Sequence, residues 1–168
     1  MHAGASIIND ISAGQLDDGM ITCAGELGVP YVCMHMKGSP QTMHNETNYD
    51  NLVKEVLDFF IGKIQECRNA GVNDVIIDPG FGFSKTIRQN FELLQNLPVF
   101  KILDKPILAG LSRKSTIYKT LGVSAEESLN GTTVLNTISL LNGASILRVH
   151  DVKEAKETIR LFLEYSEK

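Results

Sequence analysis

The sequence has no tryptophan, only three cysteines and no long apolar run. Cys23, Cys33 and Cys67 are odd in number and form no C-x-x-C pair, which indicates reduced thiols and excludes a disulfide framework or a cysteine zinc site. No stretch approaches the ~20 apolar residues that cross a bilayer. No basic-then-apolar leader opens the chain. We therefore expect a cytoplasmic protein without a membrane partner.

An excess of positive charge is also lacking. Sixteen Lys and Arg residues against 20 Asp and Glu residues give a net charge of -4, whereas proteins that bind duplex nucleic acid usually carry a basic surface. A nucleic-acid partner is therefore disfavoured. The 168 residues, 43% hydrophobic and 21% charged, are typical of a single globular domain with a substantial core.

Five short apolar runs, each rich in β-branched or aromatic residues, predict strands that are buried on both faces. These runs lie at residues 5–8, 31–34, 75–77, 107–109 and 146–149. Apolar residues with helical spacing predict helices within 52–67, 129–141 and 152–162. A capping box at Ser124–Glu127 opens the second of these helices. Strands and helices that alternate in this way predict a parallel α/β fold.

Polar residues follow the C-terminal end of every apolar run. They are Asn9 and Asp10, then His35 and Lys37, then Asp78, then Ser112, Arg113 and Lys114, and finally Arg148, His150 and Asp151. A (β/α)₈ barrel, or TIM barrel, builds its site from that edge of every strand, whereas a doubly wound sheet builds it at one switch point. Polar ends on all five runs favour the barrel. A complete barrel takes roughly 250 residues, so five βα units in this chain predict an incomplete barrel.

The segment Asp78-Pro79-Gly80-Phe81-Gly82-Phe83-Ser84-Lys85 is the most informative stretch. A carboxylate ends a predicted buried strand, two glycines permit a tight turn, and two aromatic side chains leave that turn. One interpretation is a strand–helix turn with a capping Asp and core Phe residues. The other is a binding site, because a buried carboxylate needs paired donors, and the amino-amidine edge of a flat heterocycle supplies two N–H groups in one plane.

Two further segments carry cations at predicted strand ends. Arg113 and Lys114 lie where a strand passes into a helix, either as an exposed basic turn or as a binding site for an anionic or polar ligand. Arg148 and His150 would point to the same side of a strand, where they form either an anion site, for example for diphosphate, or a salt bridge to Asp151.

Other polar residues are less specific. Asn9 suits a heterocycle edge but equally suits a cap, and Met34 suits the core or a pocket wall. The spacing of His35 and His44 is not that of metal ligands, so no protein-bound metal is expected in this chain.

Taken together, these motifs resemble the dihydropteroate synthase family over essentially the whole chain and in family order. They are Asn9-Asp10-Ile11-Ser12, Met34-His35-Met36-Lys37-Gly38, Asp78-Pro79-Gly80-Phe81-Gly82-Phe83, Gly110-Leu111-Ser112-Arg113-Lys114-Ser115 and Arg148-Val149-His150-Asp151. The resemblance implies a TIM barrel of folate biosynthesis. Such a transferase joins 6-hydroxymethyl-7,8-dihydropterin diphosphate to p-aminobenzoate and releases diphosphate, and sulfonamides compete with p-aminobenzoate.

The resemblance also implies roles for particular residues. Asn9, Met34, Asp78, Lys114 and Arg148 would bind the pterin. Phe83, Arg113 and Ser115 would border the p-aminobenzoate pocket, and Arg148 with His150 would hold the diphosphate. Lys114, Arg148 and Asp78 would carry the catalytic effect, because fixed cations stabilise a departing diphosphate.

The resemblance begins at what would be the fourth strand of the family barrel. Residues 1–168 are therefore expected to form one pterin-binding domain that lacks the first three βα units, and to be inactive or nearly so alone. Mg²⁺ is expected to be held through the diphosphate, with its protein ligand in the missing N-terminal part. The resemblance further implies a homodimer for the intact protein.

Two rival interpretations remain. One is a pterin-binding barrel of the methyltetrahydrofolate methyltransferase type, which transfers a methyl group. The other is a non-catalytic barrel fragment that binds pterin weakly or assembles with a complementary piece.

Overall fold

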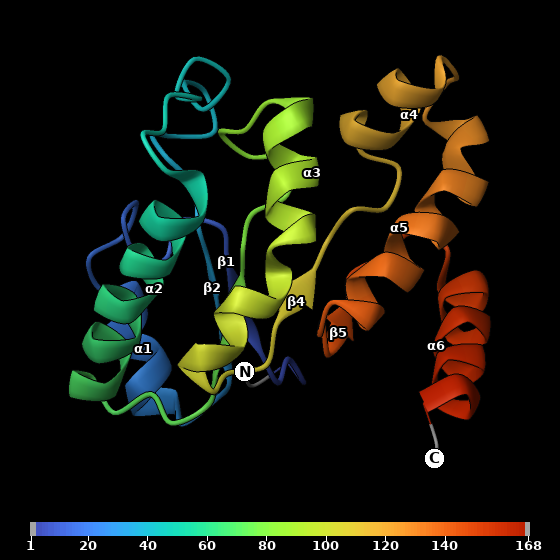
Figure 1. Ribbon diagram of the computed structural model, residues 1–168. Coiled ribbons are helices and arrows are strands. Elements are labelled where there is room, and N and C mark those ends of the chain that lie inside the picture. Colours follow the sequence, from blue (N-terminus) through green and yellow to red (C-terminus); the bar gives the residue numbers. More distant parts are fainter. Residues whose placement is uncertain (1–2, 167–168) are drawn as a thin grey trace.

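Strands and helices alternate along residues 3–166, the part of the chain that the computed structural model describes (Figure 1). The strands are β1 (Ile8–Asp10), β2 (Tyr31–Met34), β3 (Val75–Asp78), β4 (Leu108–Ala109) and β5 (Ile146–Leu147). The α-helices are α1 (Met20–Leu27), α2 (Leu52–Asn69), α3 (Ile87–Gln95), α4 (Ser115–Leu121), α5 (Leu129–Leu141) and α6 (Val152–Ser166), and the 3₁₀ helices are η1 (Leu97–Leu103) and η2 (Glu126–Ser128).

All observed strand pairs are parallel. One sheet has the order β1-β2-β3, a second pairs β4 with β5, and a bridge between Ile77 and Ile107 links the two. The register places Asn9 opposite Val32 and Met34 opposite Asp78. The strands therefore follow one another in chain order, as they do in a TIM barrel.

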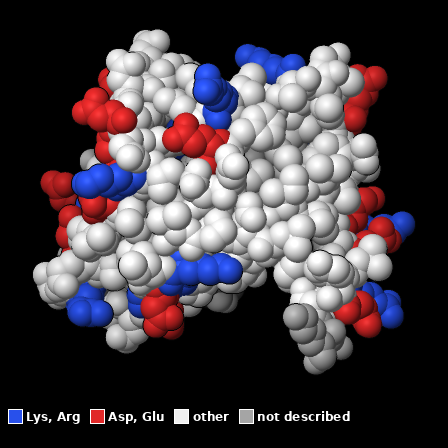
Figure 2. Space-filling view, in the orientation of Figure 1, with Lys and Arg blue, Asp and Glu red and all other residues white. Residues whose placement is uncertain are grey.

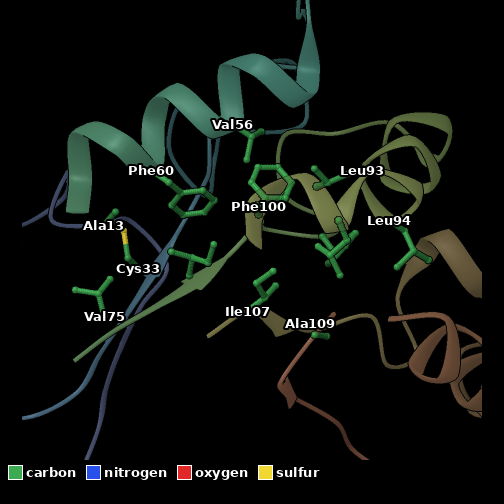
Figure 3. Close-up of a cluster of buried hydrophobic side chains, with 14 of the residues drawn as sticks. Ala13, Cys33, Val56, Phe60, Val75, Leu93, Leu94, Phe100, Ile107 and Ala109 are labelled. Carbon is green, nitrogen blue, oxygen red and sulfur yellow. The ribbon is translucent and has the colours of Figure 1, made fainter. Parts of the chain in front are cut away.

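The sheet packs one face against the helices. Side chains of this face join a large buried cluster in which Phe60 of α2 and Phe100 of η1 meet edge to face, with ring centroids 6.1 Å apart (Figure 3). Tyr31, Cys33 and Ile77 belong to the same cluster. Because successive side chains of a strand alternate in direction, the residues between them point to the opposite face.

The opposite face of the sheet carries a much smaller apolar cluster. It consists of Val32, Ile76 and Leu108, with Ile146 packed against them. In a barrel this face is the interior. Asn9, Met34 and Asp78 share it, because each lies in register with, or two residues from, a member of that cluster. The alternation thus brings the predicted pterin residues of three strands to one face.

The first predicted strand was placed too early in the chain. Residues 5–7 are exposed, and β1 begins at Ile8, whose backbone N–H donates to the carbonyl of Pro30 at 3.0 Å. Asn9 and Asp10 therefore lie inside the strand, not after it. The physical reason is that pairing begins where β2 supplies partners, and β2 starts only at Tyr31.

The predicted capping box is confirmed. The Ser124 N–H donates to Oε2 of Glu127 at 3.0 Å, and the Glu127 N–H donates to Oγ of Ser124 at 3.3 Å. The box opens the short 3₁₀ helix η2, which runs directly into α5.

The surface matches the composition. On the face shown in Figure 2, basic and acidic side chains are interspersed. Cys23, Cys33 and Cys67 are all free thiols. Within residues 3–166 no helix has both the length and the apolar character needed to cross a bilayer.

Candidate active site

Asp78 is the buried carboxylate at the end of β3. Its side chain is 6% exposed, and its Oδ1 accepts a hydrogen bond from the Gly80 N–H at 2.8 Å. Burial raises its pKa above the usual value. The Gly80 hydrogen bond and the positive charges of Lys114, Arg148 and Lys85 act in the opposite direction. Asp78 is therefore a carboxylate held largely out of water, with cations close by.

The turn after Asp78 is built by two glycines with left-handed backbones. Gly80 has φ of 73°, and a Cβ there would meet the carbonyl oxygen of His35 at 2.0 Å. Gly82 has φ of 80°, and a Cβ there would meet Cδ of Lys114 at 2.9 Å. Any side chain at either position would push the turn away from its neighbours. These close contacts and the left-handed backbone explain why the turn requires glycine at both positions.

Lys114 reaches back over that turn from the start of α4. Its Nζ donates to the carbonyl oxygen of Phe81 and lies 4.7 Å from the centroid of the Phe83 ring. Burial lowers the pKa of Lys114 to about 8; the charge of Asp78 opposes this shift and that of Arg148 adds to it. Lys114 thus lies over the ring of Phe83 and within electrostatic reach of Asp78, and the roles of the three residues in ligand binding stay predictions.

Arg148 follows β5 on the interior face, two residues beyond Ile146. Its side chain lies against Gly110, where a Cβ would be 3.5 Å from Nε of Arg148. Arg148 is exposed. The charge of Arg148 acts on both Asp78 and Lys114, so the three residues predicted to carry the catalytic effect lie within electrostatic reach of one another.

Asn9 and Met34 complete the interior face. Asn9 is exposed in β1 and Met34 is buried at the end of β2. The neighbouring Asp10 points to the helix side, where its carboxylate accepts hydrogen bonds from Ser12, Gly14 and the hydroxyl of Tyr31. Asp10 therefore holds the first loop, while Asn9 is available to a ligand.

His150 and Ser112 join the ends of β5 and β4. Oγ of Ser112 lies 3.0 Å from Nδ1 of His150, and the His150 N–H donates to the same oxygen at 3.2 Å. The sequence does not indicate His150 as the hydrogen-bond partner of Ser112. The contact therefore ties the segment after β5 to the segment after β4.

The sequence left open whether Arg148 and His150 form a salt bridge to Asp151. In the structure Arg113 forms that ion pair. Its Nε and Nη2 donate to the two carboxylate oxygens of Asp151 at 2.9 and 2.8 Å. Nη1 donates to the carbonyls of Ala125 and Glu126. The guanidinium therefore faces Asp151, and its predicted place beside p-aminobenzoate stays a prediction, as does that of the half-buried Ser115 at the first position of α4.

Two buried residues lie in segments that the sequence singles out, but the sequence assigns neither of them a role in the site. Lys85 is 8% exposed and His35 is 3% exposed, and Nζ of Lys85 lies 3.1 Å from Nδ1 of His35. The sequence signals are that Lys85 ends the stretch that begins at Asp78 and that His35 follows a predicted strand. Its partner lies 50 residues away, beyond the reach of any spacing argument.

Three comparisons describe what the chain is similar to. The profile of a family described as pterin binding enzyme matches residues 1–150. The dihydropteroate synthase of Escherichia coli K12 is 42% identical over 160 residues, which cover 94% of this chain and 56% of the relative.

Solved structures agree with the sequence comparison. The dihydropteroate synthase of Yersinia pestis, in complex with a sulfonamide drug, superposes with a TM-score of 0.94 at 37% identity, over 98% of this chain and 60% of that one. The enzyme of Thermus thermophilus in complex with 6HMPPP gives 0.93 at 34% identity, over 99% and 66%, and the same enzyme has been solved with 4-aminobenzoate. The chain thus has the fold of these proteins, but spans little more than half the length of the E. coli relative.

Proposed function

Since the pterin binding enzyme profile matches residues 1–150, the chain belongs to that family, and we propose that it supplies the pterin- and diphosphate-binding part of a dihydropteroate synthase. The observation that carries this proposal is the cluster of Asp78, Lys114 and Arg148 on the interior face. A lone buried carboxylate beside two cations suits a ligand that is a hydrogen-bond donor at one edge and an anion at the other.

The carboxylate determines how the ring would bind. One oxygen of Asp78 is engaged by Gly80, and the carboxylate retains acceptor capacity for the amino-amidine edge of a pterin. Met34, in register with Asp78, supplies an apolar wall for the ring. Asn9 supplies an amide that both donates and accepts. We infer that these residues orient the pterin so that its methylene group points to the open edge of the sheet.

The cations act on the leaving group. When the bond between the methylene carbon and the diphosphate oxygen breaks, the diphosphate leaves with the electron pair. The amine of p-aminobenzoate then forms the C–N bond and gives up a proton. Lys114 and Arg148 stabilise the charge that develops on the diphosphate, and the imidazole of His150 donates a hydrogen bond to it. Orientation of the amine matters more than deprotonation, so no nucleophile of the protein is required.

Magnesium has no evident site among these residues. In residues 3–166 no group of three or more His, Cys, Asp or Glu side chains is placed to hold a metal ion, and the groups around the proposed diphosphate position are cations, whereas Mg²⁺ prefers oxygen ligands. Mg²⁺ therefore enters the proposal only as a companion of the diphosphate substrate, and no step is assigned to it. A cytoplasmic location and a homodimer of the intact protein stay predictions.

The test is calorimetric titration of the purified 168-residue chain with 6-hydroxymethylpterin. We expect binding by the wild type and by Asp58→Asn, an exposed carboxylate of α2 paired with Lys54, and loss of binding in Asp78→Asn. Absence of binding by the folded wild type would overturn the proposal.

Turnover separates the reaction classes. With 6-hydroxymethyl-7,8-dihydropterin diphosphate and p-aminobenzoate, we expect any product to appear with diphosphate release, at a rate far below that of a full-length synthase. Methyl transfer from methyltetrahydrofolate would favour the methyltransferase alternative instead, and pterin binding without either reaction would favour a non-catalytic fragment.

A further inference from the structure

Lys85 is a buried cation for which the proposed chemistry has no use. Its Nζ lies 3.1 Å from Nδ1 of His35, 3.2 Å from the carbonyl oxygen of Gly80 and 3.1 Å from that of Phe83. An ammonium group has three N–H donors and no acceptor. Three acceptors therefore meet three protons, and the charged form of Lys85 is fully hydrogen-bonded although it is only 8% exposed.

His35 is suited to accept this bond. Because an ammonium can only donate, Nδ1 of His35 must be the unprotonated nitrogen, and the ring proton lies on Nε2. Burial, together with the charges of Lys85 and Lys37, lowers the pKa of His35 to about 2. The ring is fixed edge-on against Phe59 at 4.9 Å, and the His35 N–H donates to the carbonyl of Asp78 at 3.0 Å.

The acceptors of Lys85 connect two parts of the site. Two of them belong to the loop 79–84, and the third follows β2. The same loop presents the carbonyl of Phe81 and the ring of Phe83 to Lys114. Oγ of Ser84, at the end of the loop, accepts a hydrogen bond from the Lys37 N–H at 2.9 Å. This bond is a second link between the loop and the residues after β2. If Lys85 released its acceptors, the loop would lose a direct link to the residue that follows β2.

We propose that Lys85, acting with His35, is a positioning residue: its ammonium holds the loop 79–84 in the conformation that places Asp78, Phe83 and Lys114 around one ligand. This inference rests on the proposed function, because it states how the proposed pterin site is held in shape. Lys85 does not touch the ligand and acts through the loop.

The hydrogen bonds by which Lys85 holds the loop 79–84 depend on pH. Burial lowers the pKa of Lys85 to about 7; the charge of Asp78 opposes this shift, and those of Lys114 and Lys37 add to it. Above that pH the neutral amine keeps two donors and gains a lone pair, which faces one of the three acceptors. The loop therefore loosens as the pH rises. His35, Asp78, Lys37 and Lys114 are the titratable groups that face Lys85, and Lys114 itself loses its proton near pH 8.

The first measurement needs no ligand. We compare the wild-type chain with Lys85→Met, which keeps the length of the side chain, and with Lys153→Met, an exposed lysine of α6, by NMR of the glycine amides and lysine Cε carbons. We expect the Gly80 and Gly82 amides to shift in Lys85→Met only, and to titrate in the wild type together with Cε of Lys85. Amides that do not follow Lys85 in the wild type would overturn the proposal, even if Lys85→Met fails to fold.

The second measurement uses 6-hydroxymethylpterin. We expect Lys85→Met to weaken its binding about tenfold below neutral pH, the loss expected for a charged hydrogen-bond network. The difference from the wild type should narrow as the pH rises through 7. His35→Asn, which can place an acceptor oxygen near Nδ1, should retain more affinity than His35→Leu. A difference independent of pH would overturn the proposal. If the amides respond but no protein, the wild type included, binds the pterin, the positioning role of Lys85 is upheld and the proposed function fails.

Discussion

Gly110 forms the surface beneath Arg148. A Cβ built on Gly110 would lie 3.5 Å from Nε, 3.9 Å from Cβ and 3.9 Å from Nη2 of Arg148. The two residues are the next pair in register after Ala109 and Leu147. The arginine side chain therefore extends over bare backbone, and the size of residue 110 determines where its guanidinium can lie.

We expect Gly110→Ala to be tolerated, because 3.5 Å is an ordinary van der Waals contact. Its pterin affinity should stay within about threefold of the wild type. Gly110→Val adds two methyl groups directed at the arginine and should displace it, with a loss of about tenfold or more, since hydrogen bonds to charged groups contribute about 1.5–3 kcal/mol. Calorimetry measures both. Equal affinities for the two variants would show that the position of Arg148 does not depend on residue 110.

Asp78→Asn should change the dependence of stability on pH in a predictable direction. The folded state raises the pKa of Asp78 above 3.8, chiefly through burial, so the folded state binds this proton more tightly than the unfolded state. The free energy of unfolding contributed by Asp78 is therefore greatest at low pH and decreases as the pH rises through the folded pKa. Urea unfolding of both proteins across this range should show the wild type losing stability relative to Asp78→Asn as the pH rises. A difference that stays constant would contradict the burial argument.

The fold was largely predictable because its main signals are local. Residues 31–34 are near-continuous in apolar character, and β2 has those bounds. The helical spacing of 52–67 predicts α2, which ends two residues later. The first strand was misplaced because apolar character does not itself specify pairing, and β1 starts only where β2 offers partners.

The site was predictable only in part. Asp78, Lys114 and Arg148 stand out because charged residues at the ends of apolar strands require an explanation. The contacts of Lys85 and Ser112 could not be predicted, since their partners His35 and His150 lie 50 and 38 residues away. Such contacts follow from strand order and register, which the sequence does not state. The open question of which residue pairs with Asp151 has the same origin.

Asp151→Asn tests the link between the loop after β4 and the start of α6. The hydrogen bonds and charge of Arg113 lower the pKa of Asp151 below 3.8. The stability that this pair contributes is therefore present above the unfolded pKa and lost as the pH falls through the folded value. We expect Asp151→Asn to melt at a lower temperature than the wild type at neutral pH, and the gap to close in acid.

The matched control for that measurement is Asp58→Asn, whose ion pair with Lys54 is largely exposed, with side chains 55% and 70% accessible. Exposed pairs of this kind contribute little to stability, so its melting temperature should stay close to that of the wild type. Equal shifts in the two variants would assign the effect of Asp151→Asn to net charge, not to the Arg113 pair.

Gly131 allows α4 and α5 to approach closely. A Cβ at this position would lie 2.4 Å from Cγ2 of Ile117 and 2.9 Å from Cδ1 of Leu121. We expect Gly131→Ala to lower the free energy of unfolding by about 1–3 kcal/mol through overpacking, although alanine is intrinsically the better helix former. Gly62 of α2 is the matched control, because an added Cβ there would have no atom within 4 Å. Gly62→Ala should raise the free energy of unfolding by about 0.5–1 kcal/mol.

A double-mutant cycle identifies the cause. Ile117→Ala removes the Cγ2 atom that a Cβ at residue 131 would strike, and by itself it costs about 2–5 kcal/mol as a large-to-small core change. In that background Gly131→Ala should cost clearly less, because the added methyl group occupies the space that the isoleucine left and only the contact with the flexible end of Leu121 remains. Urea unfolding of the four proteins gives the coupling energy. Additive costs would mean that the substitution at residue 131 acts through the helix backbone and not through the contact between α4 and α5.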